Sequence, residues 1–273
     1  MSAKKTQVLL VLGAVVLFVL LFIAPKMASK SSDVLGSKQF AGNTTALNLN
    51  ATINVYVNTA LKNLEPQKKQ IFDKLTALKN YDSCAAFWDK QKRPDLASYY
   101  VEELAKNSNS ATNWFKAGNR YYYAVQFSQD QTEVPILYQC AMRCFNKGLK
   151  LEPSNIDAKI MLGSCYVEGT SAPMDGITIL KQIEKTDSNN VKLQSAFASF
   201  SVKSGQVDKA IYRYNKILQL DSTNIAVYLY LADIYEQQNN TQKTIDVLEK
   251  YAAKTNDVTA KLEITKYIQQ LEK

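Results

Sequence analysis

The 273-residue sequence contains no histidine. This absence excludes Ser-His-Asp and Cys-His catalysis, and it excludes every metal site that depends on an imidazole ligand. The sequence also lacks a GxxxxGKS or GxxxxGKT loop that could hold a phosphate, and its carboxylates are scattered along the chain. We therefore predict that the protein is not an enzyme and that it holds no metal ion and no cofactor.

Glycine and proline are also scarce, with nine and six residues. Because both residue types interrupt helices, this scarcity is typical of a mostly helical chain. The net charge of +8 is less informative than its size suggests, since Lys4, Lys5, Lys26 and Lys30 flank an apolar N-terminal run. The remaining basic excess is spread along the chain, and we predict no binding to nucleic acid.

Residues 8–24 form an unbroken apolar run, which as a helix would be about 25 Å long and near the lower limit for crossing a bilayer. We interpret this run as a transmembrane signal anchor. A cleaved signal peptide is the alternative, but Pro25 follows the run directly, and Lys26 and Met27 do not suit a cleavage site.

The charges around this run bear on its orientation. Lys4 and Lys5 favour an N-terminus in the cytoplasm, although Lys26, Lys30 and Lys38 nearly balance them. Because the N-terminal tail is so short, we predict that it stays inside and that the long C-terminal region lies outside the cytoplasm. The reverse topology, with a domain that faces the cytoplasm, remains open as an alternative.

A pattern repeated after 34 residues organises the chain between residues 191 and 257. In the second copy, positions 4, 7, 8, 11, 20, 24 and 27 hold Tyr228, Leu231, Ala232, Tyr235, Thr244, Leu248 and Tyr251. In the first copy they hold Gln194, Phe197, Ala198, Ser201, Ala210, Tyr214 and Ile217. Positions 4 to 11 lie on one face of a first helix, positions 20 to 27 on one face of a second, and the small residues at 8 and 20 allow close approach.

This pattern resembles that of the tetratricopeptide-repeat (TPR) family. One helix hairpin cannot bury its apolar face alone, so the resemblance implies an all-α solenoid of stacked helix-turn-helix repeats. We predict five repeats, at residues 78–110, 111–155, 156–190, 191–224 and 225–257. The second repeat contains about eleven additional residues around 126–135, which we predict to be an extended loop between its helices.

The remaining segments complete the predicted organisation. We assign residues 1–26 to the N-terminal transmembrane anchor, 27–52 to a flexible linker rich in Ser, Asn, Gly, Ala and Thr, 53–77 to a helical cap or degenerate repeat, and 258–273 to a C-terminal capping helix.

Four cysteines, Cys84, Cys140, Cys144 and Cys165, fall at helix positions where small residues pack. Their spacing lacks the paired C-x2-C knuckles of a metal site. We interpret all four as buried or partly buried free thiols. A disulfide between Cys165 and either Cys140 or Cys144 is the alternative.

The TPR resemblance implies a concave groove lined by first-helix positions 2, 5, 9, 12 and 13. The candidate groove residues are Phe115, Asn119, Tyr122, Tyr123, Ile160, Lys192, Lys203, Leu229 and Asp233. The aromatic residues of the second repeat are suitable anchors for an apolar or extended peptide. Packing of Phe115 and Tyr122 against the insertion or a neighbouring helix is the alternative. The family's carboxylate clamp has a lysine where this chain has Phe115, so we do not expect binding of chaperone tails.

The resemblance therefore implies a membrane-anchored scaffold that binds a protein or peptide partner. The chain looks like the bacterial inner-membrane proteins that cross the membrane once and hold a periplasmic repeat domain near secretion or envelope-assembly machinery. A TPR receptor that faces the cytoplasm is one alternative. A structural component that forms homo-oligomers within a membrane complex is the other.

Overall fold

The structure, a computed structural model, describes residues 49–108, 110–128 and 130–272. All of them belong to one of two compact units, Thr45–Lys273. The predicted anchor at residues 8–24 and nearly all of the predicted linker lie outside the described residues. Within the described part, no helix is long and apolar enough to cross a membrane.

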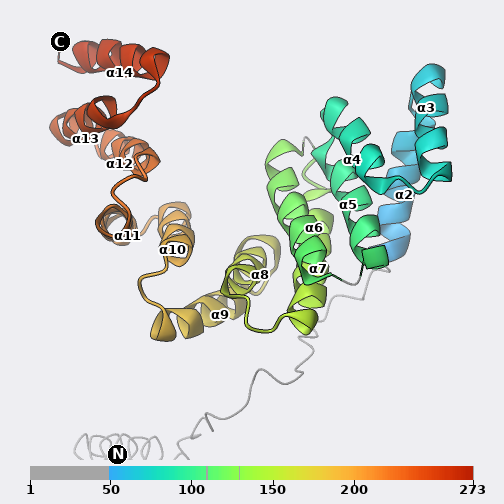
Figure 1. The fold of residues 1–273 in the computed structure, drawn as a ribbon. Helices are drawn as coiled ribbons and strands as arrows, with labels where there is room; N and C mark the ends of the chain where they lie inside the picture. The colour runs from blue at the N-terminus through green and yellow to red at the C-terminus, as the bar shows by residue number, and fades with distance from the viewer. Residues whose placement is uncertain (1–48, 109, 129, 273) are drawn as a thin grey trace, which may run out of the picture. The chain divides into compact units, whose positions relative to one another are not determined.

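The regular structure of the described residues is entirely helical, with thirteen α-helices and one 3-10 helix (Figure 1). The helices are α2 (Leu49–Lys62), α3 (Pro66–Ala77), α4 (Tyr81–Lys90), α5 (Pro94–Ser108), α6 (Ala111–Ala124), η1 (Val125–Phe127), α7 (Val134–Leu151), α8 (Ile156–Gly169), α9 (Pro173–Thr186), α10 (Val191–Lys203), α11 (Val207–Leu220), α12 (Ala226–Gln237), α13 (Thr241–Lys254) and α14 (Val258–Leu271). The prediction of an all-helical, TPR-like solenoid is confirmed for this part of the chain.

Consecutive helices pack as hairpins: α4 with α5, α6 with α7, α8 with α9, α10 with α11, and α12 with α13. The small residues at positions 8 and 20 of the pattern lie inside these hairpins. Ala198 on α10 and Ala210 on α11 are fully buried, and Gly163 on α8 lies against Gly176 on α9. Close approach of two helix backbones therefore requires the small residues that the sequence pattern shows.

Several helices begin at a polar side chain that caps the first turn. The side chain before the helix accepts a hydrogen bond from a first-turn amide at α4 (Asn80), α6 (Ser110), α8 (Asn155), α10 (Asn190), α13 (Asn240) and α14 (Asp257). Each such cap contributes roughly 1 kcal/mol to helix stability. Four of these caps start the first helix of a repeat, so local sequence fixes where those repeats begin.

The turns within two hairpins need a left-handed backbone. Gly205, between α10 and α11, has a φ of +70°, which glycine adopts without strain. Asn239 has a φ of +56° in the corresponding turn between α12 and α13, where asparagine is better tolerated than most residues. The predicted turn segments of these two repeats therefore have the residues that their backbone requires.

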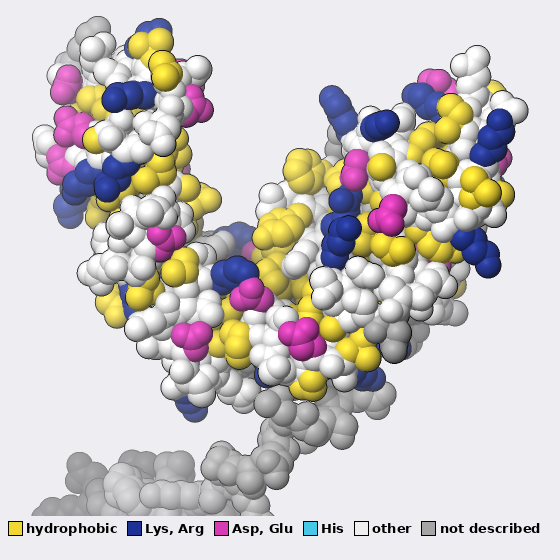
Figure 2. Space-filling model, viewed as in Figure 1, with side chains coloured by type: hydrophobic (Ala, Val, Ile, Leu, Met, Phe, Trp, Pro, Cys, Tyr) yellow, Lys and Arg dark blue, Asp and Glu magenta, His cyan; other side chains and the backbone are white. Residues whose placement is uncertain are grey.

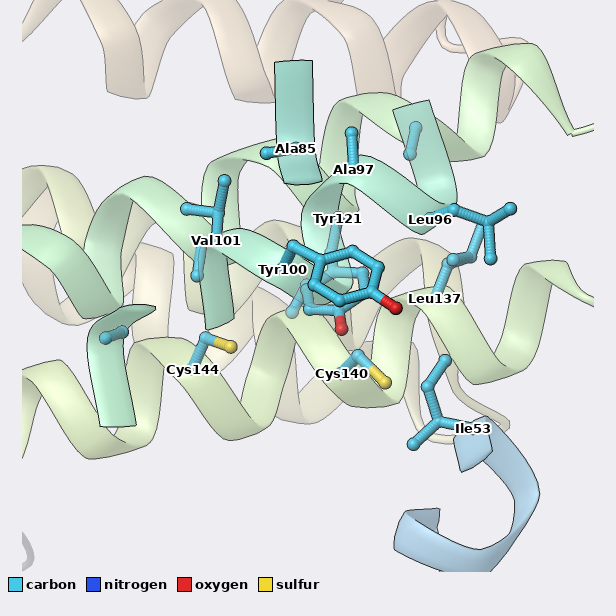
Figure 3. Close-up of a cluster of buried hydrophobic side chains, with 14 of the residues drawn as sticks. Ile53, Ala85, Leu96, Ala97, Tyr100, Val101, Tyr121, Leu137, Cys140 and Cys144 are labelled. Atoms are coloured by element: carbon cyan, nitrogen blue, oxygen red, sulfur yellow. The ribbon is translucent and has the colours of Figure 1, made fainter. Parts of the chain in front are cut away.

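The largest core cluster extends from α2 to α8 and contains several buried aromatic residues. The Phe72 ring meets those of Trp88 and Tyr100 edge-on, with ring centroids 5.4 and 5.2 Å apart. Figure 3 shows another part of this cluster, where Tyr121 of α6 lies among residues of α5 and α7, including Cys140. Two smaller clusters continue the core, one from α8 to α10 and the other from α10 to α14.

The insertion in the second repeat is more helical than predicted. Residues Val125–Phe127 continue α6 as a 3-10 turn, and α7 already begins at Val134 and runs for 18 residues. Pro135 lies in the first turn of α7, where a missing backbone N–H removes no intrahelical hydrogen bond. The prediction of an extended loop over residues 126–135 was therefore wrong at both ends, because η1 includes the first of these residues and α7 includes the last.

Helix α2, the first helix of the described residues, packs on the second helices of the first two repeats. Arg93, at the start of α5, donates a hydrogen bond of 2.7 Å to the Tyr56 hydroxyl, and Arg143 of α7 donates one of 2.9 Å to Asn50 Oδ1. Ile53 and Val57 are the buried residues of α2. Helix α2 therefore contacts two successive repeats.

Replacing Gly176 by alanine is expected to destabilise the protein, although alanine in a helix normally adds about 1 kcal/mol of stability over glycine. The new Cβ would lie 2.8 Å from the Val167 amide nitrogen and closer still to the Gly163 carbonyl oxygen. Because α8 and α9 would have to separate, we expect the free energy of unfolding in urea to fall by roughly 1–3 kcal/mol. The control Thr178→Ala, at an exposed position of α9, should change it by less than about 0.5 kcal/mol. Increased stability of Gly176→Ala would contradict this close packing.

Candidate functional site

A surface pocket of about 790 Å³ runs along α6. Its lining residues are Pro94, Thr112, Phe115, Lys116, Asn119, Arg120, Tyr123, Ala124, Phe127, Glu152 and Asn155. Three of the predicted groove residues, Phe115, Asn119 and Tyr123, therefore lie together on one surface. Figure 2 shows hydrophobic side chains gathered on this part of the molecule beside lysine and arginine side chains.

The aromatic residues of this pocket differ in exposure. Tyr123 is 53% exposed and Phe127 is 67% exposed. Phe115 is half-buried, and its ring lies so close to Gly148 of α7 that a Cβ at that position would clash with it. Phe115 therefore packs against its hairpin partner and also forms a fixed wall of the pocket, while Tyr123 and Phe127 offer accessible apolar area.

Tyr122 has a structural role and does not line the pocket. Its hydroxyl donates a hydrogen bond of 2.6 Å to Glu168 Oε2 on α8, and its ring lies edge-on to Tyr138. Burial and the neighbouring carboxylate both raise the pKa of Tyr122. The alternative interpretation, packing against a neighbouring helix, holds for this residue.

The two predicted groove lysines are paired within the solenoid. Lys192 of α10 forms an ion pair with Asp157 of α8, and Lys203 of α10 forms one with Glu168 of α8. In each pair the two residues are 35 positions apart, so they occupy nearly equivalent places in adjacent repeats. Their charges contribute to the contact between repeats. The two ammonium groups are therefore less available to form ion pairs with a binding partner.

The remaining predicted residues lie elsewhere. Ile160 is only 2% exposed, because apolar residues of α9 and α10 cover it, so its assignment to an accessible groove was wrong. Leu229 is half-buried against the C-terminal core cluster. Asp233 is exposed and accepts a hydrogen bond of 3.0 Å from Gln237 one turn later. None of these three lines the pocket on α6.

Sequence reasoning missed several lining residues. Phe127 belongs to the insertion that we predicted to be a loop, although it is the one aromatic residue in the polar stretch 126–135. Lys116 and Arg120 occupy positions 6 and 10 of the repeat, which the family's groove positions do not include. Glu152 comes from the turn between α7 and α8, which only the folded hairpin brings next to α6.

The polar groups of the pocket divide into engaged and free ones. Arg120 forms an ion pair with Asp89 of α4, and the Glu152 carboxylate accepts a hydrogen bond of 2.9 Å from the Asn155 amide. By contrast, neither Lys116 nor the Asn119 side chain has a hydrogen-bond or ion-pair partner among the described residues. The pocket therefore has a free ammonium group and a free amide next to exposed aromatic rings.

The four cysteines are buried free thiols, as predicted. Burial raises the pKa of Cys84 from 9.0 to about 11 and that of Cys140 to about 12. Raised values disfavour the reactive thiolate. No group of three or more cysteine and acidic side chains within the described residues could hold a metal ion.

A second cavity, of about 510 Å³, lies between α2, α5 and α7. Glu102 on its wall is 0% exposed and forms an ion pair of 2.6 Å with Arg143, while the Tyr121 hydroxyl donates to it at 2.9 Å. A buried carboxylate with these partners joins α5, α6 and α7 across two repeats. We interpret this group as structural.

Stacked helix hairpins with small residues at the helix contact form a TPR-like solenoid, and one of its first helices carries the recessed surface described above. Residues 201–262 match the family model described as "Tetratricopeptide repeat". This match covers most of the fourth repeat, all of the fifth repeat and the start of α14. No curated protein matches the chain.

Several solved structures are similar to the chain. YrrB, described as a TPR protein with an unusual peptide-binding site, is 20% identical over 68% of this chain and 90% of its own, with a TM-score of 0.40. TTC0263, a TPR protein of Thermus thermophilus, is 15% identical over 68% and 96%, with a TM-score of 0.47. PilW, a type IV pilus biogenesis factor, is 13% identical over 71% and 93%, also at 0.47. At these values the likeness carries no argument about function.

The buried thiols and tyrosines make the protein less stable at alkaline pH. Burial raises the pKa of Tyr99 and Tyr214 from 10.0 to about 12, and that of the thiols from 9.0 as above. Because the folded protein keeps these protons to a higher pH than the unfolded chain does, their contribution is full below about pH 9 and is lost as the pH rises. Urea denaturation at pH 7, 8.5 and 10 should show that the free energy of unfolding falls between pH 8.5 and 10 and not between pH 7 and 8.5.

Thiol labelling tests the same burial directly. Ellman's reagent at pH 8 should leave all four cysteines of the native protein unmodified for hours and modify them at once in urea. Ser222→Cys, at an exposed turn position, is the control and should react immediately in the native protein. Rapid labelling of the unaltered protein would contradict the buried positions of the four thiols.

Proposed function

We propose that the protein is a membrane-anchored TPR scaffold that binds a segment of a partner protein along α6. The observation that supports this proposal is the pocket in which Tyr123 and Phe127 expose apolar area beside the free polar groups of Lys116 and Asn119. Exposed aromatic residues that gather in a recess are typical anchors of protein interfaces.

The surroundings of the pocket support binding of a partner rather than chemistry on a substrate. Among its described lining residues, the only carboxylate is Glu152, which accepts a hydrogen bond from Asn155, and none is a cysteine. The pocket also lies on the first helix of a repeat, whose position is fixed by contacts with α5 and α7. A rigid, pre-formed surface reduces the conformational entropy that a partner loses on binding.

Membrane anchoring is the second part of the proposal. It rests on the apolar run at residues 8–24 and on the lysines that precede it. In the proposed topology the C-terminal region lies outside the cytoplasm, and in a Gram-negative bacterium this compartment is the periplasm. An anchor confines the scaffold to one surface and raises its effective concentration there. Support of envelope-protein assembly or secretion is the role that fits this placement.

Self-association is the second candidate, because one observation favours it. The last helix, α14, leaves Val258 and Leu262 exposed, and Leu262 is 54% exposed. These two apolar side chains lie one turn apart on the same face of the helix. They would allow α14 to pack against a second copy of the chain.

A peptide selection tests partner binding. Random peptides displayed on phage are selected on the full-length protein in detergent micelles and then tested against Tyr123→Ala and Phe127→Ala. We expect each substitution to weaken binding of the enriched peptides at least tenfold, because it removes an exposed anchor. Tyr212→Ala, which removes a tyrosine of similar exposure on α11, should not change binding. Peptides that bind all four proteins equally would contradict the proposal.

Protease accessibility tests the anchor and its orientation. In intact spheroplasts of a Gram-negative host, added protease should degrade the repeat domain, and the protein should remain with the membrane after washing with carbonate. Protection until lysis would reverse the proposed topology in favour of a scaffold that faces the cytoplasm. Release by carbonate would contradict the anchor itself.

A further inference from the structure

We infer that the surface along α6 recognises an extended segment of about six residues with an acidic side chain at one end and a large apolar side chain at the other. This inference rests on the proposed function, since it names the class of partner that the same surface accepts. The evidence for it is the order of the lining side chains along α6 and the fact that some of the nearby charged residues form ion pairs within the chain whereas Lys116 does not.

The side chains that face the pocket form a stripe with a direction. Thr112, Lys116, Asn119 and Tyr123 are spaced by four, three and four residues, which places them on one face of the helix. The hydroxyl and ammonium groups lie in the first half of α6, and Tyr123 lies near its end. Phe127 of η1 extends the apolar part beyond the helix. A ligand that meets the Lys116 ammonium group at one end therefore meets the exposed rings of Tyr123 and Phe127 at the other, with the half-buried Phe115 ring beside Lys116.

The length of the stripe defines the length of the ligand. The 14 residues of α6 span about 20 Å at ~1.5 Å per residue. An extended chain rises by roughly 3.3 Å per residue, so about six residues cover this distance. The rise along the helix between Lys116 and Phe127 is about 16 Å, which is the separation of the first and last side chains of such a segment.

One cation that lines the surface has no ion-pair partner among the described residues. Arg120, Lys192 and Lys203 are each paired with a carboxylate of this chain. Lys116 is exposed and has no such partner among the described residues. Glu152, the one carboxylate among the described lining residues, accepts a hydrogen bond from the neutral Asn155 amide and keeps its charge. A carboxylate of the ligand would pair with the Lys116 ammonium group, which has no ion-pair partner among the described residues.

Asn119 lies between the charged and the apolar parts of the stripe. Its side-chain amide offers both a donor and an acceptor, and neither is used by another described side chain. The backbone of an extended segment presents the complementary carbonyl and N–H groups. This position thus favours an extended backbone over a helix, whose backbone groups are already paired with one another.

Defined peptides test the inference. The hexapeptide DSASAF and its reverse FASASD, with blocked termini and a fluorescent label, allow both chain directions, and binding to the full-length protein in detergent micelles is followed by anisotropy. One of the two should bind. Asparagine in place of its aspartate should weaken binding about threefold, as expected for an exposed ion pair. Alanine in place of its phenylalanine should weaken it at least tenfold, because the apolar anchor is lost.

Substitutions of Lys116 show whether this residue reads the acidic side chain. Lys116→Gln should remove the difference between the aspartate and asparagine peptides without weakening the asparagine peptide. Lys116→Glu should reverse the preference, so that a lysine peptide binds better than the aspartate peptide. The matched control Lys250→Gln, at an exposed position of α13, should leave every affinity unchanged.

Several outcomes would overturn the inference. These are equal affinity for the aspartate and asparagine peptides, a difference that survives Lys116→Gln, or no binding of either direction. Self-association of the protein that disappears in Tyr123→Ala and Phe127→Ala would assign the surface to a second copy instead. The phage selection separates these failures from failure of the proposed function. Pocket-dependent peptides without acidic residues would leave the proposed function intact, whereas selected peptides that ignore the pocket would remove it.

Discussion

Close contact between the two helices of each hairpin is the constraint on which the rest of this solenoid depends. At Gly163 and Gly176 two backbones touch, and elsewhere Ala198 and Ala210 allow nearly the same approach. Because the helices are this close, larger neighbours such as Leu180 and Phe145 fill the space beside the contact. The direction of α6, and hence the surface that it presents, follows from its contact with α7.

The helical repeat could be predicted from sequence because its signals are local. A period of 34 residues, polar caps such as Asn155 and Asn190, and turn residues such as Gly205 all act within a few positions of one another. The insertion was harder to predict, because a polar stretch that contains a proline is typical of a loop. Pro135 nevertheless lies where a helix tolerates it, and packing of Leu137 and Tyr138 extends α7 toward it.

The candidate site was predictable only in part, for a different reason. The repeat pattern indicates which side of a first helix faces outward, and Phe115, Asn119 and Tyr123 were found in this way. It does not indicate which outward residues the next repeat will cover or pair. Ile160 is covered by apolar residues of α9 and α10, and Lys192 is paired with Asp157. Such contacts depend on the packing between repeats, which no single repeat encodes.

Glu168 of α8 receives a hydrogen bond from Tyr122 of α6 and an ion pair from Lys203 of α10. One carboxylate thus holds together the first helices of three successive repeats. Its substitution would loosen both neighbours of α8 together, and the change would reach α6 through Tyr122. A survey of variants scored only by partner binding would therefore count Glu168 among the contact residues, although it does not line the pocket on α6.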